Sequence, residues 1–231
     1  MKVAVIAFPG SNCDDDVVQA VSDVLGCSVT KVWHRNRLDT EPDLIILPGG
    51  FSYGDYLRSG AMAARSPIMD DVRREVRRGR LVLGICNGFQ VLTESGLLPG
   101  ALLTNRHPGF LCRPCTVRVE RTDSPFTGTF REGQVVNFPI AHNEGRYYLP
   151  PSDLEKLEKD GRVLFRYCND RGETGDDFNP NGALNHIAGI LSEEGNVLGL
   201  MPHPERSSDI LLGCDDGILF WKSIQTWVER R

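Results

Sequence analysis

The stretch Arg80-Leu81-Val82-Leu83-Gly84-Ile85-Cys86-Asn87-Gly88-Phe89-Gln90 decides the fold class of this chain. A short apolar run ends in Gly-x-Cys-x-Gly, and residues typical of a helix follow it. This pattern predicts a nucleophile on a sharp turn between a strand and a helix, where the two glycines leave room around Cys86. A helix N-terminus favours negative charge, so we expect the thiolate of Cys86 to be stabilised there.

Short apolar segments alternate with amphipathic segments on the amino-terminal side of this turn. We expect strands at residues 2–8, 28–33, 43–47 and 81–85, and helices at residues 14–25, 67–78 and 87–95. Strands that alternate with helices in this way form a mostly parallel sheet with helices on both faces. The sequence therefore predicts an α/β fold whose ligand site lies beyond the carboxyl ends of the strands.

The pattern changes from about Leu102, where apolar segments are joined by Gly, Asn and Pro turns. We expect strands at residues 116–120, 134–138, 163–167, 186–191 and 197–201, and a closing helix at 216–229. No linker, internal repeat or low-complexity tract interrupts the chain. A single domain spanning residues 1–231 is therefore predicted.

Composition excludes several classes of function. The chain has a net charge of −5, which argues against a general nucleic-acid binder or a binder of anionic membranes. We expect no leader or membrane span, because the apolar segments are too short. The seven cysteines are odd in number and scattered, which indicates a reducing, cytoplasmic location.

No metal or cofactor is expected on this chain. Cys112 and Cys115 form one C-x-x-C pair without a second pair at zinc spacing. Cys13 precedes three aspartates, which we interpret as acidic charges at a helix N-terminus. Neither a dinucleotide-binding glycine motif nor a Walker phosphate loop occurs in the sequence.

A candidate base for Cys86 follows the last predicted strand, in Met201-Pro202-His203-Pro204-Glu205. A thiolate that attacks a carbonyl needs a base and a group that orients this base. His203 is the candidate base, and Glu205 can reach its far ring nitrogen because the intervening proline stiffens the backbone. The order Cys…His…Glu differs from the Ser…Asp…His order of α/β hydrolases and indicates another family with similar geometry.

Backbone donors for the oxyanion are expected from two loops. The glycines of Pro48-Gly49-Gly50-Phe51 allow a substrate oxygen to approach the backbone closely. Gly50, Phe51 or both would supply one N–H group, and Asn87, the residue after the nucleophile, would supply the second.

These three elements together resemble the class I (triad) glutamine amidotransferases, in which Pro-Gly-Gly, a Gly-x-Cys-x-Gly elbow and His-Pro-Glu occur in this order. Gln90 stands at the expected place, four residues after the cysteine. Within this class the chain is similar to the glutaminase subunits of phosphoribosylformylglycinamidine synthase. Residues 8–13, 49–58, 84–90 and 201–206 resemble that family, and Pro139-Ile140-Ala141-His142-Asn143-Glu144-Gly145-Arg146-Tyr147 is the most discriminating stretch. The resemblance implies a flavodoxin-like sheet with additional C-terminal strands.

The resemblance also implies a reaction and its partners. L-glutamine would be hydrolysed at Cys86 through a glutamyl thioester, with His203 as base and then acid and Glu205 orienting it. Gln90, His142 and Glu144 would hold the glutamine. Ammonia would pass to a large synthetase subunit, which uses ATP and Mg to convert formylglycinamide ribonucleotide to formylglycinamidine ribonucleotide in purine biosynthesis. A small bridging subunit would complete the complex.

Three alternatives remain open at this point. The chain resembles, less closely, a glutaminase subunit of another amidotransferase, which lacks the stretch around His142. A DJ-1/PfpI-like enzyme also places a cysteine on such an elbow, but it lacks the His-Pro-Glu segment and Gln90. A non-catalytic module on the same fold would be expected to lack a triad member, and Cys86, His203 and Glu205 are all present.

Overall fold

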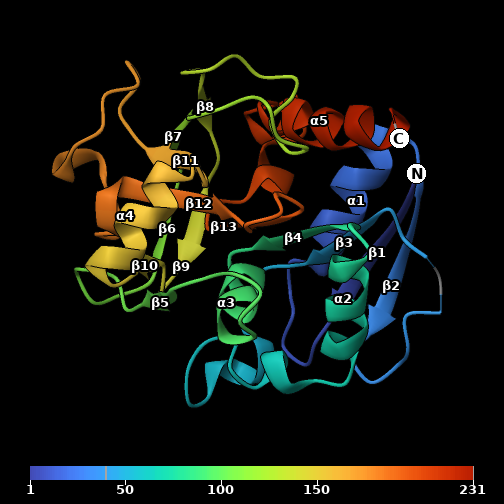
Figure 1. The fold of residues 1–231 in the computed structure, drawn as a ribbon. Coiled ribbons are helices and arrows are strands. Elements are labelled where there is room, and N and C mark those ends of the chain that lie inside the picture. The colour runs from blue at the N-terminus through green and yellow to red at the C-terminus, as the bar shows by residue number, and fades with distance from the viewer. Residues whose placement is uncertain (40, 231) are drawn as a thin grey trace.

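The computed structural model describes residues 1–39 and 41–230 and is organised around a nine-stranded sheet (Figure 1). Five strands at one end of the sheet run parallel, and their order is β2 (Ser28–Trp33), β1 (Lys2–Ala7), β3 (Leu44–Leu47), β4 (Leu81–Ile85) and β13 (Val197–Leu200). This is the strand order of flavodoxin-like sheets. The predicted α/β class and flavodoxin-like sheet are therefore confirmed.

Helices cover both faces of the parallel strands. On one face lie α1 (Asp14–Leu25) and α5 (Gly217–Glu229), and on the other lie α2 (Ile68–Arg77) and α3 (Asn87–Glu94) (Figure 1). Every residue of β3, β4 and β13 is buried. Because both faces are covered, these central strands read as continuous apolar runs rather than alternating ones.

The remaining four strands extend the same sheet in antiparallel fashion. Their order outward from β13 is β12 (Ile187–Leu191), β11 (Val163–Tyr167), β7 (Thr116–Val119) and β8 (Val135–Asn137). All five strands predicted after residue 102 are present, and β13 pairs in parallel with β4, with Val197 opposite Val82. The carboxyl end of β13, which leads to His203, therefore lies beside the end of β4, which leads to Cys86.

Several short elements were not predicted. Four three-residue strands form two small antiparallel sheets, in which β5 (Ala101–Leu103) pairs with β10 (Arg146–Tyr148) and β6 (Leu111–Arg113) pairs with β9 (Ile140–His142). Helix α4 (Pro151–Lys159) was also missed, although it carries proline in its first turn and buries Leu157. Segments of three residues are too short to show a periodic pattern.

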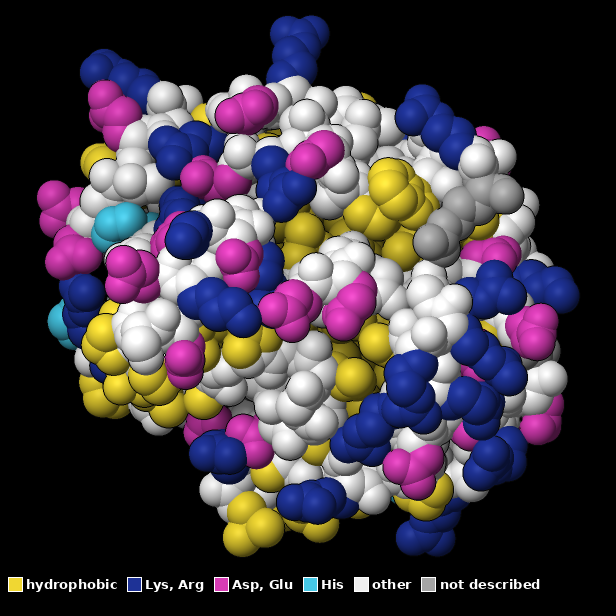
Figure 2. All heavy atoms as spheres, viewed as in Figure 1, with side chains coloured by type: hydrophobic (Ala, Val, Ile, Leu, Met, Phe, Trp, Pro, Cys, Tyr) yellow, Lys and Arg dark blue, Asp and Glu magenta, His cyan; other side chains and the backbone are white. Residues whose placement is uncertain are grey.

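The surface carries both signs of charge, as Figure 2 shows for one face. Two arginines in and just after α2 are neutralised locally, since Arg74 pairs with Asp71 and Glu75, and Arg78 lies 3.1 Å from Glu75. None of the helices in residues 1–39 and 41–230 is long and apolar enough to cross a membrane.

Candidate active site

Cys86 stands on a strained turn between β4 and α3. Its backbone has φ 50° and ψ −104°, which a non-glycine residue adopts only at a cost of about 1–3 kcal/mol. The flanking glycines allow the helix to pack closely on the sheet. A Cβ atom at Gly88 would lie 1.9 Å from the carbonyl oxygen of Leu47, and one at Gly84 would lie 2.5 Å from Leu92 Cδ1. Close packing of α3 on β3 and β4 therefore fixes the position of the sulfur.

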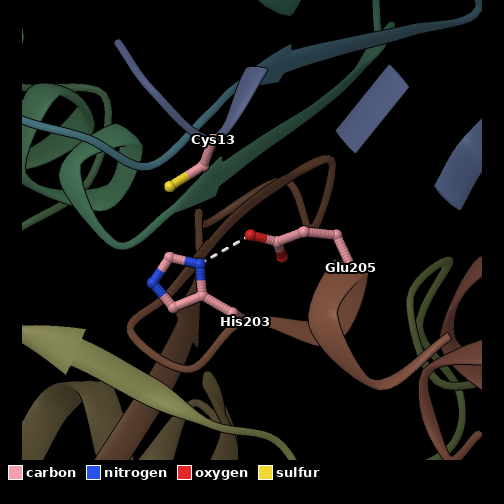
Figure 3. Close-up of side chains that lie close together, drawn as sticks. All are labelled: Cys13, His203 and Glu205. Carbon is pink, nitrogen blue, oxygen red and sulfur yellow. Dashed lines mark hydrogen bonds and ion pairs between the residues drawn. The ribbon is translucent and has the colours of Figure 1, made fainter. Parts of the chain in front are cut away.

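His203 and Glu205 form a buried pair directly after β13. His203 Nδ1 lies 2.6 Å from Glu205 Oε1 (Figure 3), and the two residues are 1% and 3% exposed. The backbone of His203 is held by a hydrogen bond from its N–H to the carbonyl of Pro139, at 2.8 Å. Glu205 is therefore placed to orient the imidazole.

The charges around His203 favour its protonated form. Burial opposes protonation, but the negative charges of Glu205 and Cys86 and the hydrogen bond to Glu205 outweigh it and raise the pKa of His203 to about 10. Its Nε2 atom has no hydrogen-bond partner within the described residues. This nitrogen is free to exchange a proton with Cys86 and with a substrate.

The structure leaves two of the three expected oxyanion donors available, the N–H groups of Gly50 and Asn87. The N–H of Phe51 already donates to the carbonyl of Gly10 at 3.0 Å, so Phe51 is engaged elsewhere. The N–H groups of Gly50 and Asn87 have no acceptor in the part of the chain that the structure describes. Gly50 has φ 138°, and a Cβ there would lie 2.8 Å from the nitrogen of Asn12, so only glycine fits.

The segment after β8 lies across the start of α3. Cys86 Sγ is 3.5 Å from the carbonyl oxygen of Ala141, to which the thiol donates. Gln90 Nε2 donates to the carbonyl of Glu144 at 2.6 Å, and Gln90 Oε1 accepts from Asn87 Nδ2 at 2.8 Å. The structure therefore brings Gln90 and Glu144 together near Cys86.

The imidazole of His142 is neutral, with its proton on Nδ1 and a free lone pair on Nε2. Asn105 Oδ1 accepts from the N–H of Gly145 and lies 3.1 Å from His142 Nδ1, which therefore carries the proton. Burial, and then the nearby His203, lowers the pKa of His142 to about 3. Its Nε2 atom is buried and has no partner within the described residues. The ring fits because a Cβ at Gly145 would lie 2.2 Å from it.

Asp55 joins this cluster and was not singled out from the sequence. Asn87 Nδ2 donates to Asp55 Oδ1 at 3.3 Å, and the N–H of Ser59 donates to Glu144 Oε2 at 3.3 Å. Burial, and then the charge of Glu144, raises the pKa of Asp55 to about 6 against hydrogen bonds from Ser59 and Asn87. Neither carboxylate forms an ion pair within the described residues. Two carboxylates with no cation beside them among the described residues therefore lie at the start of α3.

The only sequence feature that points to Asp55 is its place in the loop after Pro-Gly-Gly, and its importance becomes visible only in the fold. Asp55 follows Gly54 in the loop after Pro-Gly-Gly, and Tyr53, Asp55 and Leu57 all have positive φ, at 55°, 54° and 71°. Such backbone strain at non-glycine residues concentrates at functional sites. These positive φ values could not be predicted from the sequence, because Tyr, Asp and Leu normally adopt negative φ.

Comparisons with known proteins agree with this geometry. The family described as a CobB/CobQ-like glutamine amidotransferase domain matches residues 1–212. A relative in Thermus thermophilus, phosphoribosylformylglycinamidine synthase subunit PurQ, is 54% identical over 230 residues and covers 100% of both chains. The protein of the same name in Methanosarcina acetivorans is 51% identical over 228 residues, which is 99% of this chain and 98% of the relative.

A solved structure gives the same result in three dimensions. A chain in the structure of PurLQS from Thermotoga maritima superposes with a TM-score of 0.87 and 43% sequence identity, covering 98% of each chain. The sequence identity and the shared fold both extend over nearly the full length. The chain therefore belongs to the glutamine amidotransferase family, and within it to the PurQ subunits of phosphoribosylformylglycinamidine synthase.

Proposed function

We propose that this chain hydrolyses L-glutamine at Cys86 and supplies the ammonia to a separate synthetase that forms formylglycinamidine ribonucleotide in purine biosynthesis. The observation that carries this proposal is the full-length similarity to PurQ subunits, at 54% identity over 230 residues. The arrangement of Cys86, His203 and Glu205 supplies the chemistry that a glutaminase needs. The same similarity disfavours a glutaminase of another pathway and a DJ-1/PfpI-like enzyme.

The reaction needs His203 to hold the proton that leaves the Cys86 thiol, and the raised pKa of His203 favours that protonated imidazole. The sulfur then attacks the carboxamide carbon. The N–H groups of Gly50 and Asn87 stabilise the oxyanion of the tetrahedral intermediate. His203 then gives the proton to the leaving nitrogen, and ammonia departs as the thioester forms. In the second half His203 takes a proton from water, which attacks the thioester and releases glutamate.

The cluster formed by Asp55, Gln90, His142 and Glu144 fits the amino-acid end of glutamine. The carboxamide carbon and the α-nitrogen are four bonds apart, about 5 Å when extended. Asp55 accepts a hydrogen bond from the side chain of Asn87, whose backbone N–H is the oxyanion donor, so Asp55 lies near the space for the amino-acid end of glutamine. The α-ammonium group supplies the cation that Asp55 and Glu144 lack, and Gln90 and His142 contribute hydrogen-bonding groups beside them.

Asp55→Asn is expected to raise KM for glutamine about 10- to 100-fold, the value of a charge-assisted hydrogen bond, with a smaller effect on kcat. Because the pKa of Asp55 is raised to about 6, its carboxylate becomes protonated as the pH falls through that value. KM of the unmodified protein should therefore rise below about pH 6, and this rise should be absent in Asp55→Asn. Steady-state kinetics from pH 5 to 8 would measure both effects, and an unchanged KM would contradict the role.

His203→Ala is expected to slow glutamine hydrolysis more than Glu205→Ala does. His203 transfers the protons, whereas Glu205 orients the ring through the 2.6 Å hydrogen bond. General acid–base catalysis contributes about 10²–10⁴-fold, so we expect His203→Ala to lose at least that factor. Single-turnover rates of thioester formation would compare the two variants, and equal or reversed losses would show that the roles are wrongly assigned.

The proposal includes partner subunits. The related structure from Thermotoga maritima is that of PurLQS, which supports a complex in which this chain docks on other subunits. We assign ATP and Mg to a large synthetase subunit and expect a small bridging subunit between them. All seven cysteines are free thiols, which supports a cytoplasmic location for the complex.

A reconstitution experiment tests the function. Extract from cells that lack this protein would receive the unmodified chain or Cys86→Ala, with glutamine or ammonium as the nitrogen source. We expect formylglycinamidine ribonucleotide to form from glutamine only with the unmodified chain, and from high ammonium without either. Glutamine-dependent synthesis in the absence of the chain would refute the purine assignment.

A further inference from the structure

Cys13 lies against the catalytic histidine although it belongs to the loop after β1. It is 3% exposed, and its N–H is held by the carbonyl of Gly49 at 3.4 Å. A Cβ atom at Gly49 would lie 3.0 Å from Cys13 Sγ and 2.7 Å from His203 Cε1. The thiol and the imidazole therefore meet over the bare backbone of Gly49, and Figure 3 shows the sulfur beside the ring and the Glu205 carboxylate.

These three side chains are spaced like the ligands of a metal ion. One ligand atom from each of Cys13, His203 and Glu205 lies within 4.8 Å of the other two. Three points so spaced have a common centre within about 2.8 Å of each, against zinc–ligand distances of about 2.3 Å for sulfur and 2.0–2.2 Å for nitrogen and oxygen. Because His203 Nδ1 and Glu205 Oε1 are now 2.6 Å apart, the carboxylate must shift away from the ring to admit a cation between the two atoms.

One of the ligands also has an unused acceptor atom. Glu205 Oε2 is buried and has no hydrogen-bond partner within the described residues. A buried carboxylate oxygen without a partner is costly, because it has lost its hydration and gained nothing in return. A cation would satisfy this carboxylate more fully than the single hydrogen bond to His203 does.

A cavity reaches one member of this group, Glu205. It measures about 790 Å³ and lies between α1, α5 and the segment after His203. Glu205 lines it together with four aspartates, Asp16, Asp23, Asp209 and Asp215, whereas its two cations are Arg206 and Lys222. The excess of negative charge would attract cations toward Glu205. The residues that surround the substrate site do not line it.

We propose that Cys13, His203 and Glu205 form a site for a thiophilic divalent cation of the zinc class, which enters through the acidic cavity and switches off the triad. The cation binds the Cys13 sulfur, His203 Nδ1 and a Glu205 oxygen, and the protons of the thiol and of Nδ1 leave to solvent. A neutral imidazole bound through Nδ1 carries its proton on Nε2. This nitrogen then cannot accept the Cys86 proton.

Arg206 lies next to the proposed site and allows a further prediction about cation affinity. Its Nη2 atom lies 3.0 Å from Cys13 Sγ, so a cation on the sulfur would sit near the guanidinium and be repelled by it. Arg206→Met is therefore expected to tighten cation binding. Weaker or equal binding by this variant would contradict the placement of the cation at Cys13.

Cadmium serves as the spectroscopic probe, because cadmium–thiolate bonds absorb in the near ultraviolet. The background is Cys86→Ala, which removes the nucleophile as a competing ligand. We expect one equivalent of Cd²⁺ to give a saturable band that disappears in Cys86→Ala/Cys13→Ser and persists in Cys86→Ala/Cys112→Ser, whose altered thiol is exposed. An unchanged band in the Cys13 variant would overturn the site.

A second variant keeps the test decisive if the Cys13 variant does not fold. Cys86→Ala/Glu205→Gln keeps the shape of the carboxylate but not its charge, and we expect Cd²⁺ affinity to fall at least about tenfold. Unchanged affinity would refute the site even if the Cys13 variant failed to fold. These measurements need no catalysis, so their outcome is independent of the proposed function.

The inhibitory consequence rests on the proposed function and is tested separately. Zn²⁺ should inhibit glutamine hydrolysis by the assembled complex, without competing with glutamine and reversibly on addition of a chelator. Cys13→Ser should require at least about tenfold more Zn²⁺. Competition with glutamine, or equal sensitivity of the Cys13 variant, would show that zinc acts elsewhere.

Discussion

Cys86→Ala is expected to lower kcat/KM for glutamine hydrolysis at least about 10⁴-fold, because it removes the nucleophile while the oxyanion donors and the base remain. The variant should stay folded. Alanine keeps the Cβ atom, and the positive φ of 50° strains either residue similarly. Urea unfolding would verify the fold, and quenched single-turnover reactions with labelled glutamine would measure the acyl-enzyme.

The matched control is Cys112→Ala, since Cys112 is an exposed free thiol outside the site. It should change kcat/KM by less than twofold. The result that contradicts the assignment is a labelled thioester that still accumulates in Cys86→Ala. Cys13 would then be the first thiol to examine, because it is the other cysteine beside His203.

The parallel half of the fold was predictable because each element carries its own local signal. The observed bounds of α1 and β2 agree with the predicted ranges, and β4 leads into Cys86 as its glycines indicate. Buried parallel strands are continuous apolar runs, and these are easy to recognise in the sequence. Cys86 and His203 could be proposed as triad members for the same reason, since each lies just after such a strand.

The rest of the site depends on contacts that no local pattern encodes. The position of Asp55 depends on three positive φ values in its loop and on the hydrogen bond that it accepts from Asn87. Cys13 comes to lie beside His203 only because β1, β3 and β13 end at the same edge of the sheet. The engagement of Phe51 with Gly10 likewise arises from two loops that the sequence places 41 residues apart. These features require the three-dimensional packing.

Gly88→Ala is expected to lower the free energy of unfolding by at least about 3 kcal/mol, the range of severe overpacking. Helix propensity alone would favour alanine in α3 by about 1 kcal/mol. The new Cβ, however, would lie 1.9 Å from the carbonyl oxygen of Leu47, and that atom belongs to the backbone of a buried central strand. The overlap can be relieved only if α3 moves away from β3, so the steric cost decides the sign.

The same displacement would move Cys86 and the N–H of Asn87 away from Gly50, so folded Gly88→Ala should also lose glutaminase activity. Gly128→Ala is the matched control, because a Cβ there would have no neighbour closer than 3.6 Å. Urea denaturation of the two variants would separate a packing effect from a general effect of replacing glycine. Equal stability of Gly88→Ala and the unmodified chain would mean that α3 does not pack on β3 as closely as the structure places it, and the geometry derived for the oxyanion donors would then fail with it.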